Sequence, residues 1–564
     1  MKNSILHHGK NTITLGMLLT MLATLPAYAA APTTGAVLEG AKPPAVTQQP
    51  AAKGPVVTVE GQTPAAKDDG QQKIAVKGFR IGGEPPMPPD DLLGLVRDDA
   101  GRDLTLGGLD AAAARITEHL RQKGFLVAFA YIPAQDIVDG MVEIAVVPGK
   151  YGKLKITGDG RFDRERLKAM LFAVAPGTVI TARPLERALL LLSDLNGVSV
   201  KATLSPGEAS GTADLLVEVS DAARWKGSAF IDNWGSRFTS RNRLGLQLTA
   251  GNIGGRGDEL TLGGLISENS LITNYNLGYS ALLGNDGLRV SASRSQVDYT
   301  LGDAFAALGA TGQATVTSVA LAYPLVRSQD FSLYGTLGYD AKRLADKLTT
   351  TKKSSLISLG VAGNFADGWL GGGTNAFSLT NCQGRLRIRD AAWAAVDAWG
   401  AGTAGSFSKT LLSFQRQQYV SDQLTLHLNF TGQLADKNLD SSEKFFLGGA
   451  DGVRAFPPGE ASGDDGYRLT GELRWRLPGL SAGKNDLYLV GFYDYGSVIL
   501  NHHRYAAADS NNRRSLMGAG LGLLWTHNPD WALRLDYAWK IGREQATADE
   551  DRNGRLWLQA MRYF

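Results

Sequence analysis

An arginine and an aspartate near the end of the chain have the residue types and surroundings of a buried ion pair. Arg454 stands in the glycine-rich segment Gly448 to Phe456, between two strand-like segments. Asp494 follows in Phe492-Tyr493-Asp494-Tyr495-Gly496. A guanidinium and a carboxylate form a bidentate, charge-assisted pair when both leave water. Such a pair would fix a loop to a strand.

Strand parity indicates the direction of Asp494. Successive side chains of a strand point to opposite faces. Leu489, Tyr493 and Tyr495 share one face, which suits lipid, and Asp494 lies on the other face with Phe492. We therefore expect Asp494 to point into the interior of a barrel.

The second half of the chain reads as strand after strand. In Leu469 to Leu477, apolar residues and Gly471 alternate with charged or polar residues, and Trp531 to Lys540 repeats the pattern. A sandwich does not turn arginines toward its core, whereas a large barrel turns them toward water in its lumen. We expect about sixteen antiparallel strands. The lumen-facing candidates are Arg468, Glu472, Arg474, Arg476, Arg534 and Asp536.

Composition and the N-terminus agree with an envelope protein. Residues 1–29 have a basic start, a short apolar run and a small-residue cleavage site, which predict a secretory signal peptide. Gly is 68 of 564 residues, well above the average of about 7%. The single cysteine, Cys382, excludes a disulfide within the chain. The net charge of +3 gives no indication of a nucleic-acid partner.

The first half divides into a linker and an internal repeat. Residues 30–72 are rich in Ala, Pro, Thr and Gln and predict a flexible linker. Two faint valine-rich patches in it, at Val37-Leu38 and Val56 to Val59, are alternatives that could pair with other elements. Residues 73–149 and 150–222 each show the order strand, helix, helix, strand, strand, which makes an internal repeat. Residues 223–564 form the predicted barrel.

The two repeats resemble polypeptide-transport-associated (POTRA) domains, which hold client polypeptides by strand addition at a sheet edge. The loop resembles that of two-partner secretion transporters, in the outer-membrane protein assembly superfamily, whose tip carries Val-Arg-Gly-Tyr or Val-Arg-Gly-Phe. Val453, Arg454 and Phe456 match, and Ala455 replaces the glycine, which disfavours a positive φ there. The family's strand motif is matched by Phe492, Asp494 and Gly496. The terminal Phe564 resembles the barrel-assembly signal of outer-membrane proteins.

The resemblance implies a fold and a function. The fold is two α+β POTRA-like periplasmic domains followed by an all-β transmembrane barrel with an inward-folded loop. The implied function is export of a large, unfolded, β-helical exoprotein through a monomeric barrel in the outer membrane of a Gram-negative bacterium. Arg454 and Asp494 would then lock the loop to the barrel. The barrel-assembly machinery and outer-membrane lipid are further implied partners.

Two alternatives remain open, an insertase of the same superfamily and a passive porin or surface receptor. Insertases usually carry more POTRA units than two, and a porin does not need client-binding repeats. In this family an N-terminal helix commonly plugs the pore, but residues 30–72 show no convincing amphipathic helix.

No sequence feature indicates an enzyme, a cofactor or a metal site. The chain contains no phosphate-binding loop, no nucleophile elbow and no zinc-type cysteine spacing. His502 and His503 lie in a polar segment that predicts a surface loop, and Glu460, Asp464 and Asp465 predict an exposed acidic turn.

Overall fold

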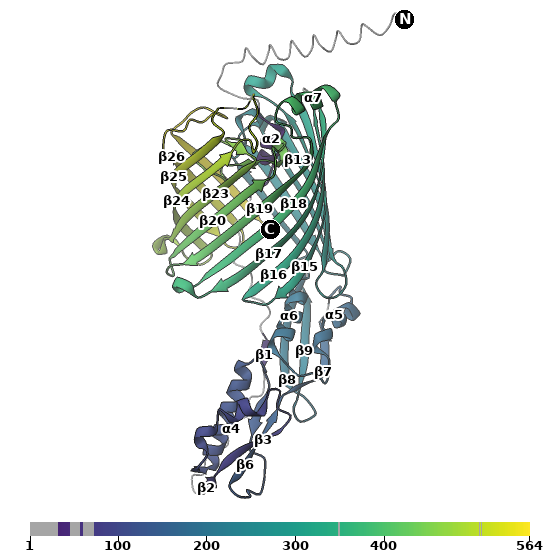
Figure 1. The fold of residues 1–564 in the computed structure, drawn as a ribbon, viewed down its shortest axis with the longest axis vertical. Coiled ribbons are helices and arrows are strands. Elements are labelled where there is room, and N and C mark those ends of the chain that lie inside the picture. Colours follow the sequence, from purple (N-terminus) through teal and green to yellow (C-terminus); the bar gives the residue numbers. More distant parts are fainter. Residues whose placement is uncertain are drawn as a thin grey trace, which may run out of the picture.

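The protein consists of two small domains joined end to end below a barrel (Figure 1). The structure, a computed structural model, describes residues 32–44, 57–59, 73–158, 160–347, 350–506, 508 and 510–564. The predicted signal peptide lies outside the described residues. No helix in the described ranges is long and apolar enough to cross a membrane.

The first domain packs one long helix on a small sheet. The three-stranded sheet has the order β3-β6-β5, and β2 pairs with β4 beside it. Helix α4 begins where the Thr105 side chain accepts the Gly108 N–H, and it buries Leu109, Ile116 and Leu120 against the sheet. The elements are β2 (Lys73–Val76), β3 (Gly78–Gly83), α3 (Pro89–Leu93), η1 (Arg97–Asp99), β4 (Arg102–Thr105), α4 (Leu106–Gln122), β5 (Phe129–Tyr131) and β6 (Met141–Val147).

The second domain has the order strand, two helices, two strands, without counterparts of β2 and β4, and it contacts the barrel. Asp194, just after α6, accepts two hydrogen bonds from Arg327 at 2.7 and 2.9 Å, and its carbonyl accepts one from Arg289 at 2.8 Å. Both arginines belong to barrel strands, so the end of α6 is fastened to the barrel. The elements are β7 (Lys150–Thr157), α5 (Arg164–Met170), η2 (Phe172–Val174), α6 (Ala182–Ser193), β8 (Val198–Pro206) and β9 (Thr212–Asp221).

Sixteen antiparallel strands form a closed barrel, which confirms the predicted fold. The first strand, β10, pairs with the last, β27, so the sheet has no free edge. The strands are β10 (Trp225–Asp232), β11 (Arg243–Gly251), β12 (Glu259–Ser267), β13 (Ile272–Leu282), β14 (Arg289–Thr300), β15 (Thr311–Arg327), β16 (Phe331–Asp346), β17 (Thr351–Asp367), β18 (Gly373–Ile388), β19 (Gly405–Tyr419), β20 (Leu424–Ala435), β23 (Asp465–Arg476), β24 (Asn485–Ile499), β25 (Arg513–His527), β26 (Trp531–Lys540) and β27 (Gly554–Tyr563).

Helix α7 (Ala391–Trp399) and several short 3-10 helices lie in the connections between strands. These are η3 (Arg237–Thr239), η4 (Glu268–Ser270), η5 (Asp303–Leu308), η6 (Trp369–Gly371), η7 (Ser441–Glu443) and η8 (Pro478–Leu480).

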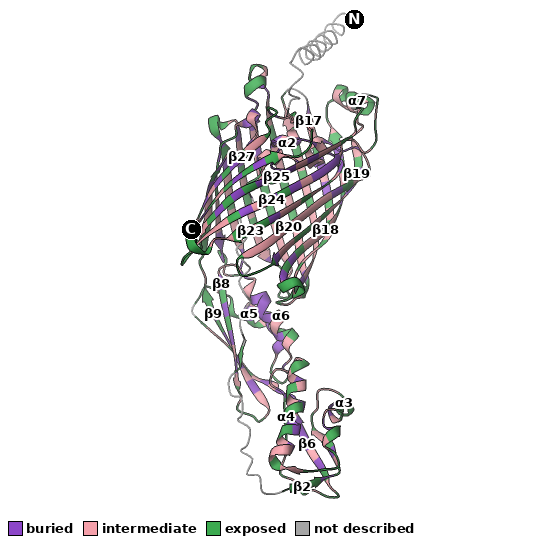
Figure 2. Ribbon diagram, turned by 90° about the vertical axis from the view of Figure 1, so that its left-hand side faces the viewer, coloured by how far each residue is buried: buried purple, intermediate pink, exposed green. Residues whose placement is uncertain are grey.

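The outer wall is apolar and aromatic. Buried and exposed residues alternate along the barrel strands (Figure 2). The exposed set on the last strands includes Leu469, Leu473, Trp475, Leu489, Tyr493, Leu533, Leu535, Tyr537 and Trp539. Side chains of this kind on a closed barrel face lipid, with aromatic residues near the interfaces.

The predicted flexible linker contains two ordered elements. Helix α2 (Thr34–Gly40) lies within the far end of the barrel (Figure 1). Strand β1 (Val57–Val59) pairs in parallel with β8 at the edge of the second domain's sheet. The expectation of a linker without structure is therefore wrong for these residues, and the sequence pattern, which left a pore helix undecided, did not reveal α2. Both patches are ordered by contacts with distant parts of the chain, which local composition does not reveal.

Candidate functional site

The loop between β20 and β23 folds back against the inner wall of the barrel. Its stem is a short antiparallel pair, β21 (Phe445–Phe446) with β22 (Ser462–Gly463). At its tip Val453, Ala455 and Phe456 are fully buried. They form one apolar cluster with wall residues such as Phe492 and Leu516. Burial of these side chains holds the tip on strands β24 and β25.

Arg454 projects from this tip into a group of carboxylates. Its Nε and Nη2 atoms donate to the two oxygens of Asp494 at 2.8 and 2.9 Å, and its backbone N–H donates to the same carboxylate at 3.2 Å. Only 3% of Arg454 and none of Asp494 is exposed to solvent. The contact has the bidentate geometry expected of a strong buried pair.

Two further carboxylates contact the same guanidinium. Arg454 Nη1 donates to Glu472 at 2.9 Å and to Asp536 at 3.2 Å. Arg534 donates to both of these carboxylates, and Arg474 donates to Glu472. Three arginines thus face three carboxylates, so the formal charges of the cluster cancel. We call this six-residue set the loop lock.

The loop lock also uses an aromatic ring and a backbone group. The Arg454 guanidinium lies 3.4 Å from the centroid of the Phe492 ring, in the position of a cation–π contact. The backbone carbonyl oxygen of Arg454 accepts a hydrogen bond of 2.7 Å from Trp557 Nε1 on the last strand. The tip residue therefore contacts strands β23, β24, β26 and β27 at once.

The predicted lumen-facing charges divide into two groups. Four of the six belong to the loop lock: Glu472, Arg474, Arg534 and Asp536. Glu472 and Asp536 bind Arg454 of the loop, and Arg474 and Arg534 bind these two carboxylates. From parity alone we expected all four to line an open aqueous path. Arg476 instead pairs with Asp486 at 2.6 Å at the base of the next hairpin, and Arg468 is half-buried opposite Gly496 in the strand register.

Glycines of the wall make room for the loop. A Cβ added to Gly496 would lie 2.6 Å from a methyl carbon of Leu447, and one added to Gly518 would lie 2.6 Å from the Cβ of Ala455. Ala455 is not among the described residues with positive φ, so the alanine fits without backbone strain. Sequence reasoning missed Gly518 and Trp557, because neither belongs to a local motif.

A second anchor holds the other side of the loop. Glu460 is fully buried and accepts hydrogen bonds of 2.8 Å from the backbone N–H groups of Thr547 and Ala548. It also pairs with Arg514 at 2.6 Å. Asp464 and Asp465 are buried as well. The expectation of an exposed acidic turn is therefore wrong, because loop and strand donors enclose all three carboxylates.

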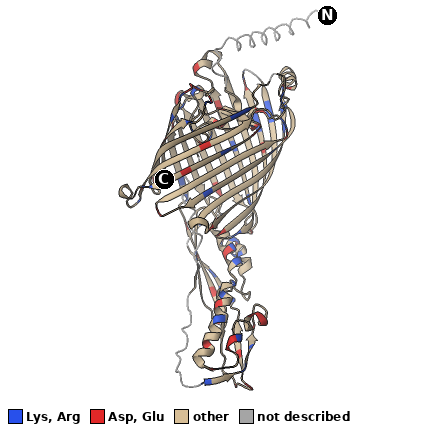
Figure 3. Cartoon of the chain, turned by 60° about the vertical axis from the view of Figure 1, so that its left-hand side comes forward, with Lys and Arg blue, Asp and Glu red and all other residues tan. Residues whose placement is uncertain are grey.

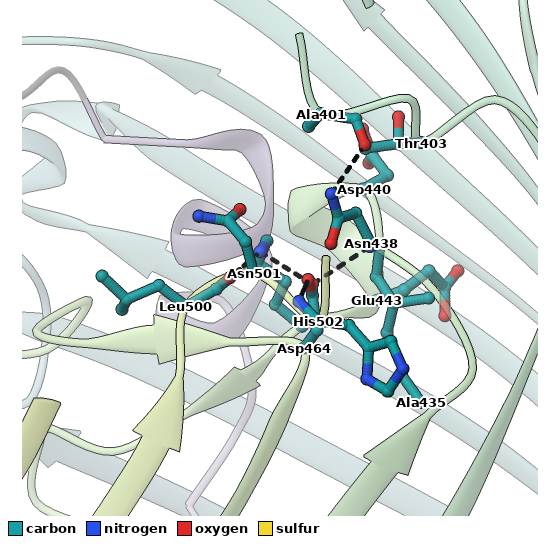
Figure 4. Close-up of polar contacts among 12 residues, drawn as sticks. Ala401, Thr403, Ala435, Asn438, Asp440, Glu443, Asp464, Leu500, Asn501 and His502 are labelled. Atoms are coloured by element: carbon teal, nitrogen blue, oxygen red, sulfur yellow. Dashed lines mark hydrogen bonds and ion pairs between the residues drawn. The ribbon is translucent and has the colours of Figure 1, made fainter. Parts of the chain in front are cut away.

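Buried polar contacts connect the loops at this end of the barrel (Figure 4). Asp464 accepts hydrogen bonds from the backbone of Leu439 at 3.0 Å and of His502 at 2.9 Å. Asn438 donates to the carbonyl oxygens of Ala401 and His503, both at 2.8 Å. His502 is thus part of a loop network, and the described residues contain no cluster of three His, Cys, Asp or Glu with metal-binding geometry.

Helix α2 occupies the lumen beside the loop. Arg243 Nη1 donates to the carbonyl oxygens of Gly40 and Lys42 at 2.6 and 3.1 Å, and Asn274 donates to that of Ala41 at 2.9 Å. Val37 is buried with wall residues in one apolar cluster. All three of these polar contacts use backbone carbonyls at the C-terminal end of the helix, where carbonyl groups lack partners within the helix.

Phe564 lies at the seam where the barrel closes. Its backbone N–H and carbonyl exchange hydrogen bonds of 3.0 and 2.7 Å with Gly227 on β10. The side chain is exposed on the outer wall. The terminal residue is therefore the last rung of the ladder between the first and last strands, and its part in barrel assembly stays a prediction.

Comparisons with known proteins agree on one family. Residues 211–524 match the model of the haemolysin secretion/activation protein ShlB/FhaC/HecB, and residues 74–149 match the ShlB-type POTRA domain. The heme/hemopexin transporter protein HuxB of Haemophilus influenzae is 27% identical over 482 residues, which cover 84% of each chain. The outer membrane transporter CdiB of Escherichia coli is 25% identical over 388 residues, 66% of this chain and 64% of that protein.

Solved structures share the fold. CdiB from Escherichia coli aligns with a TM-score of 0.69 at 20% identity, over 94% of this chain and 95% of that one. BamA from Haemophilus ducreyi lacking POTRA domains 1–3 aligns with a TM-score of 0.50 at 16% identity, over 87% of this chain and the whole of that one. These structures share with this chain the arrangement of small domains followed by a barrel.

Proposed function

This chain belongs to the haemolysin secretion/activation protein family ShlB/FhaC/HecB, and on that premise we propose how it moves its client. It is an outer-membrane transporter of two-partner secretion, with POTRA domains in the periplasm and a secreted exoprotein as its partner.

Capture uses an edge strand in the first domain. In the order β3-β6-β5, strand β5 is an edge that an added strand can extend. The Ala130 N–H of β5 donates to the Thr117 side chain of α4 at 2.8 Å, so an added strand must replace this contact. Phe129 and Tyr131 on β5 are exposed, and their ring centroids lie 5.9 Å apart. An unfolded, strand-forming client segment would gain backbone hydrogen bonds from this edge and apolar contact from the two rings.

The second domain offers a client one fewer unpaired sheet edge than the first domain does. Its sheet has the order β1-β8-β9-β7, so a strand of the chain itself already covers β8. A client that adds to β8 must displace β1, which is only three residues long. The Asp194 contacts with Arg327 and Arg289 keep this domain at the mouth of the barrel, where a captured segment enters the lumen.

Gating depends on α2, and the observation that carries the proposal is how this helix is held. Wall side chains bind it through its backbone carbonyls, and Arg243 is also paired with Asp232 by two hydrogen bonds of 2.8 Å that do not involve the helix. Departure of the helix therefore leaves the buried Arg243 with its Asp232 partner. We propose that α2 closes the resting lumen and leaves it during export, while the loop lock stays in place.

Co-expression with an exoprotein tests the proposed function. We expect secretion of the client to require this chain and to stop when residues 74–149 are deleted, while the barrel remains in the outer membrane. Unchanged export by the deletion variant would contradict capture by the first domain. A general loss of barrel proteins on depletion of this chain would indicate an insertase instead.

A further inference from the structure

Three cations face one another across neighbouring strands of the barrel wall. Arg343 on β16 is directly opposite Lys353 on β17, and Lys353 is directly opposite Arg387 on β18. Residues in such register have Cβ atoms about 5 Å apart. Arg385 lies two residues from Arg387 on the same face of β18. We call Arg343, Lys353 and Arg387 the cationic row.

The cationic row points away from the lumen. Lys342 and Lys352, the neighbours of Arg343 and Lys353, pair with the lumen residues Glu443 and Asp440 at 2.7 and 2.5 Å. Leu386, the neighbour of Arg387, is buried in an apolar cluster with Leu439 of the inward loop. Because side chains alternate along a strand, the row lies on the outer wall, and all three side chains are exposed.

In the described part of the outer wall, no carboxylate stands directly opposite a residue of the row. Thr315, opposite Arg343 on β15, is uncharged. Outward carboxylates on the described strands near this end belong to Asp298 on β14 and Asp436 after β20, so β15 and β19 stand between them and the row. Asp390, which follows β18, accepts the backbone N–H groups of Ala392 and Trp393 at the start of α7. Like charges directly opposite one another destabilise a sheet. An arrangement of this kind favours a bound anion that bridges the cations.

The position of the row identifies the anion. Toward the small domains, the same outward faces of β16 and β17 continue with apolar and aromatic side chains. These side chains are exposed, as lipid-facing residues are: Leu337, Tyr339, Ile357 and Leu359. The row lies beyond this apolar surface, near the strand ends remote from the POTRA domains, where blue Lys and Arg stretches mark the wall (Figure 3). These strand ends reach the headgroup region of the outer leaflet.

We propose that the cationic row binds the phosphate groups of the outer-leaflet glycolipid, lipopolysaccharide. Arginine donors match phosphate oxygens in bidentate geometry, and lysine adds a point charge. The lipid-facing surface below the row would accommodate the acyl chains of the same molecule. The row is thus a lipid-anchoring site on the outside of the transporter, separate from the path of the client.

Retained lipopolysaccharide on the purified full-length chain tests this site. The variant Arg343→Gln/Lys353→Gln/Arg387→Gln removes the row. The matched control, Arg294→Gln/Arg513→Gln/Arg562→Gln, removes three outward arginines that face no cation across a strand. After extraction in mild detergent, we expect the row variant to retain at least about tenfold less lipopolysaccharide per barrel than the control. Heat-dependent electrophoretic mobility shows that both barrels are folded.

Add-back experiments distinguish the sources of phosphate. Delipidated wild-type protein should rebind phosphorylated lipopolysaccharide, bind a dephosphorylated preparation at least about tenfold more weakly, and keep its lipid in millimolar inorganic phosphate. Equal retention by the row and control variants would overturn the proposal, as would complete displacement by inorganic phosphate. If the row variant lost client secretion but retained as much lipopolysaccharide as the control, the row would instead bind an acidic client segment. This result would also overturn the proposal.

Discussion

The lumen contains two inserted segments, the loop and helix α2, which are held in opposite ways. The loop inserts a charged side chain into the wall, and every hydrogen bond described for the Asp494 carboxylate comes from Arg454. Helix α2 offers backbone carbonyls to the wall, and Arg243, which binds two of them, is paired with Asp232 as well. Removal of the loop leaves a buried charge, whereas water can replace the wall's contacts with the helix. The loop is therefore a fixed part of the barrel and the helix a removable one.

The largest expected effect comes from breaking the loop lock. Arg454→Ala leaves Asp494 buried without a partner, a loss of about 3–5 kcal/mol. We expect client secretion to fall more than tenfold, while the barrel is still present in the outer membrane. Secretion into the medium, normalised to the amount of folded barrel, measures this.

Arg454→Lys is the matched control, because it keeps the charge but cannot form the bidentate contact. It should secrete less than wild type and more than the alanine variant. Normal secretion by Arg454→Ala would show that the loop is not a fixed part of the pathway.

A smaller effect is expected from crowding helix α2. A Cβ added to Gly35 would lie 1.9 Å from the carbonyl oxygen of Ser441, whereas one added to Gly40 would meet nothing within 4 Å. Gly35→Ala should therefore expel the helix and raise the conductance of the purified channel in planar bilayers. Gly40→Ala, in the same helix, should conduct like wild type. Equal conductance of the two variants would contradict closure of the lumen by α2.

The smallest effect is expected from a single wall contact. Asn274→Asp replaces the amide that donates to the Ala41 carbonyl with a carboxylate that repels it. Loss of one such hydrogen bond is worth about 1 kcal/mol, so we expect channel openings to become only several-fold more frequent. The control is Asn276→Asp, one pleat along the same face of β13. If both variants opened equally often, the Asn274 contact would have no part in holding the helix.

Much of how the loop is held in the barrel was predictable from the sequence, whereas little of how helix α2 is held could be predicted. Alternation along Leu469 to Leu477 and around Asp494 predicted the barrel and the inward carboxylate, and the family motif supplied the expectation that Arg454 meets Asp494. Parity gives the face of a side chain but not its neighbours across the lumen, so Glu472 and Asp536 were expected to line water. Helix α2 is seven residues long and depends on Arg243 and Asn274, more than two hundred residues away, so no local pattern predicts its place.

Reversible tethers compare the two segments most directly. In a background without Cys382, one variant joins α2 to the wall through cysteines at Ala41 and Asn274, and another joins the loop to the wall through cysteines at Leu447 and Gly496. Client secretion is measured with each tether oxidised and then reduced. We predict that the α2 tether blocks secretion until it is reduced, while the loop tether leaves secretion unchanged. Secretion through the tethered helix, or a block by the tethered loop, would contradict the account.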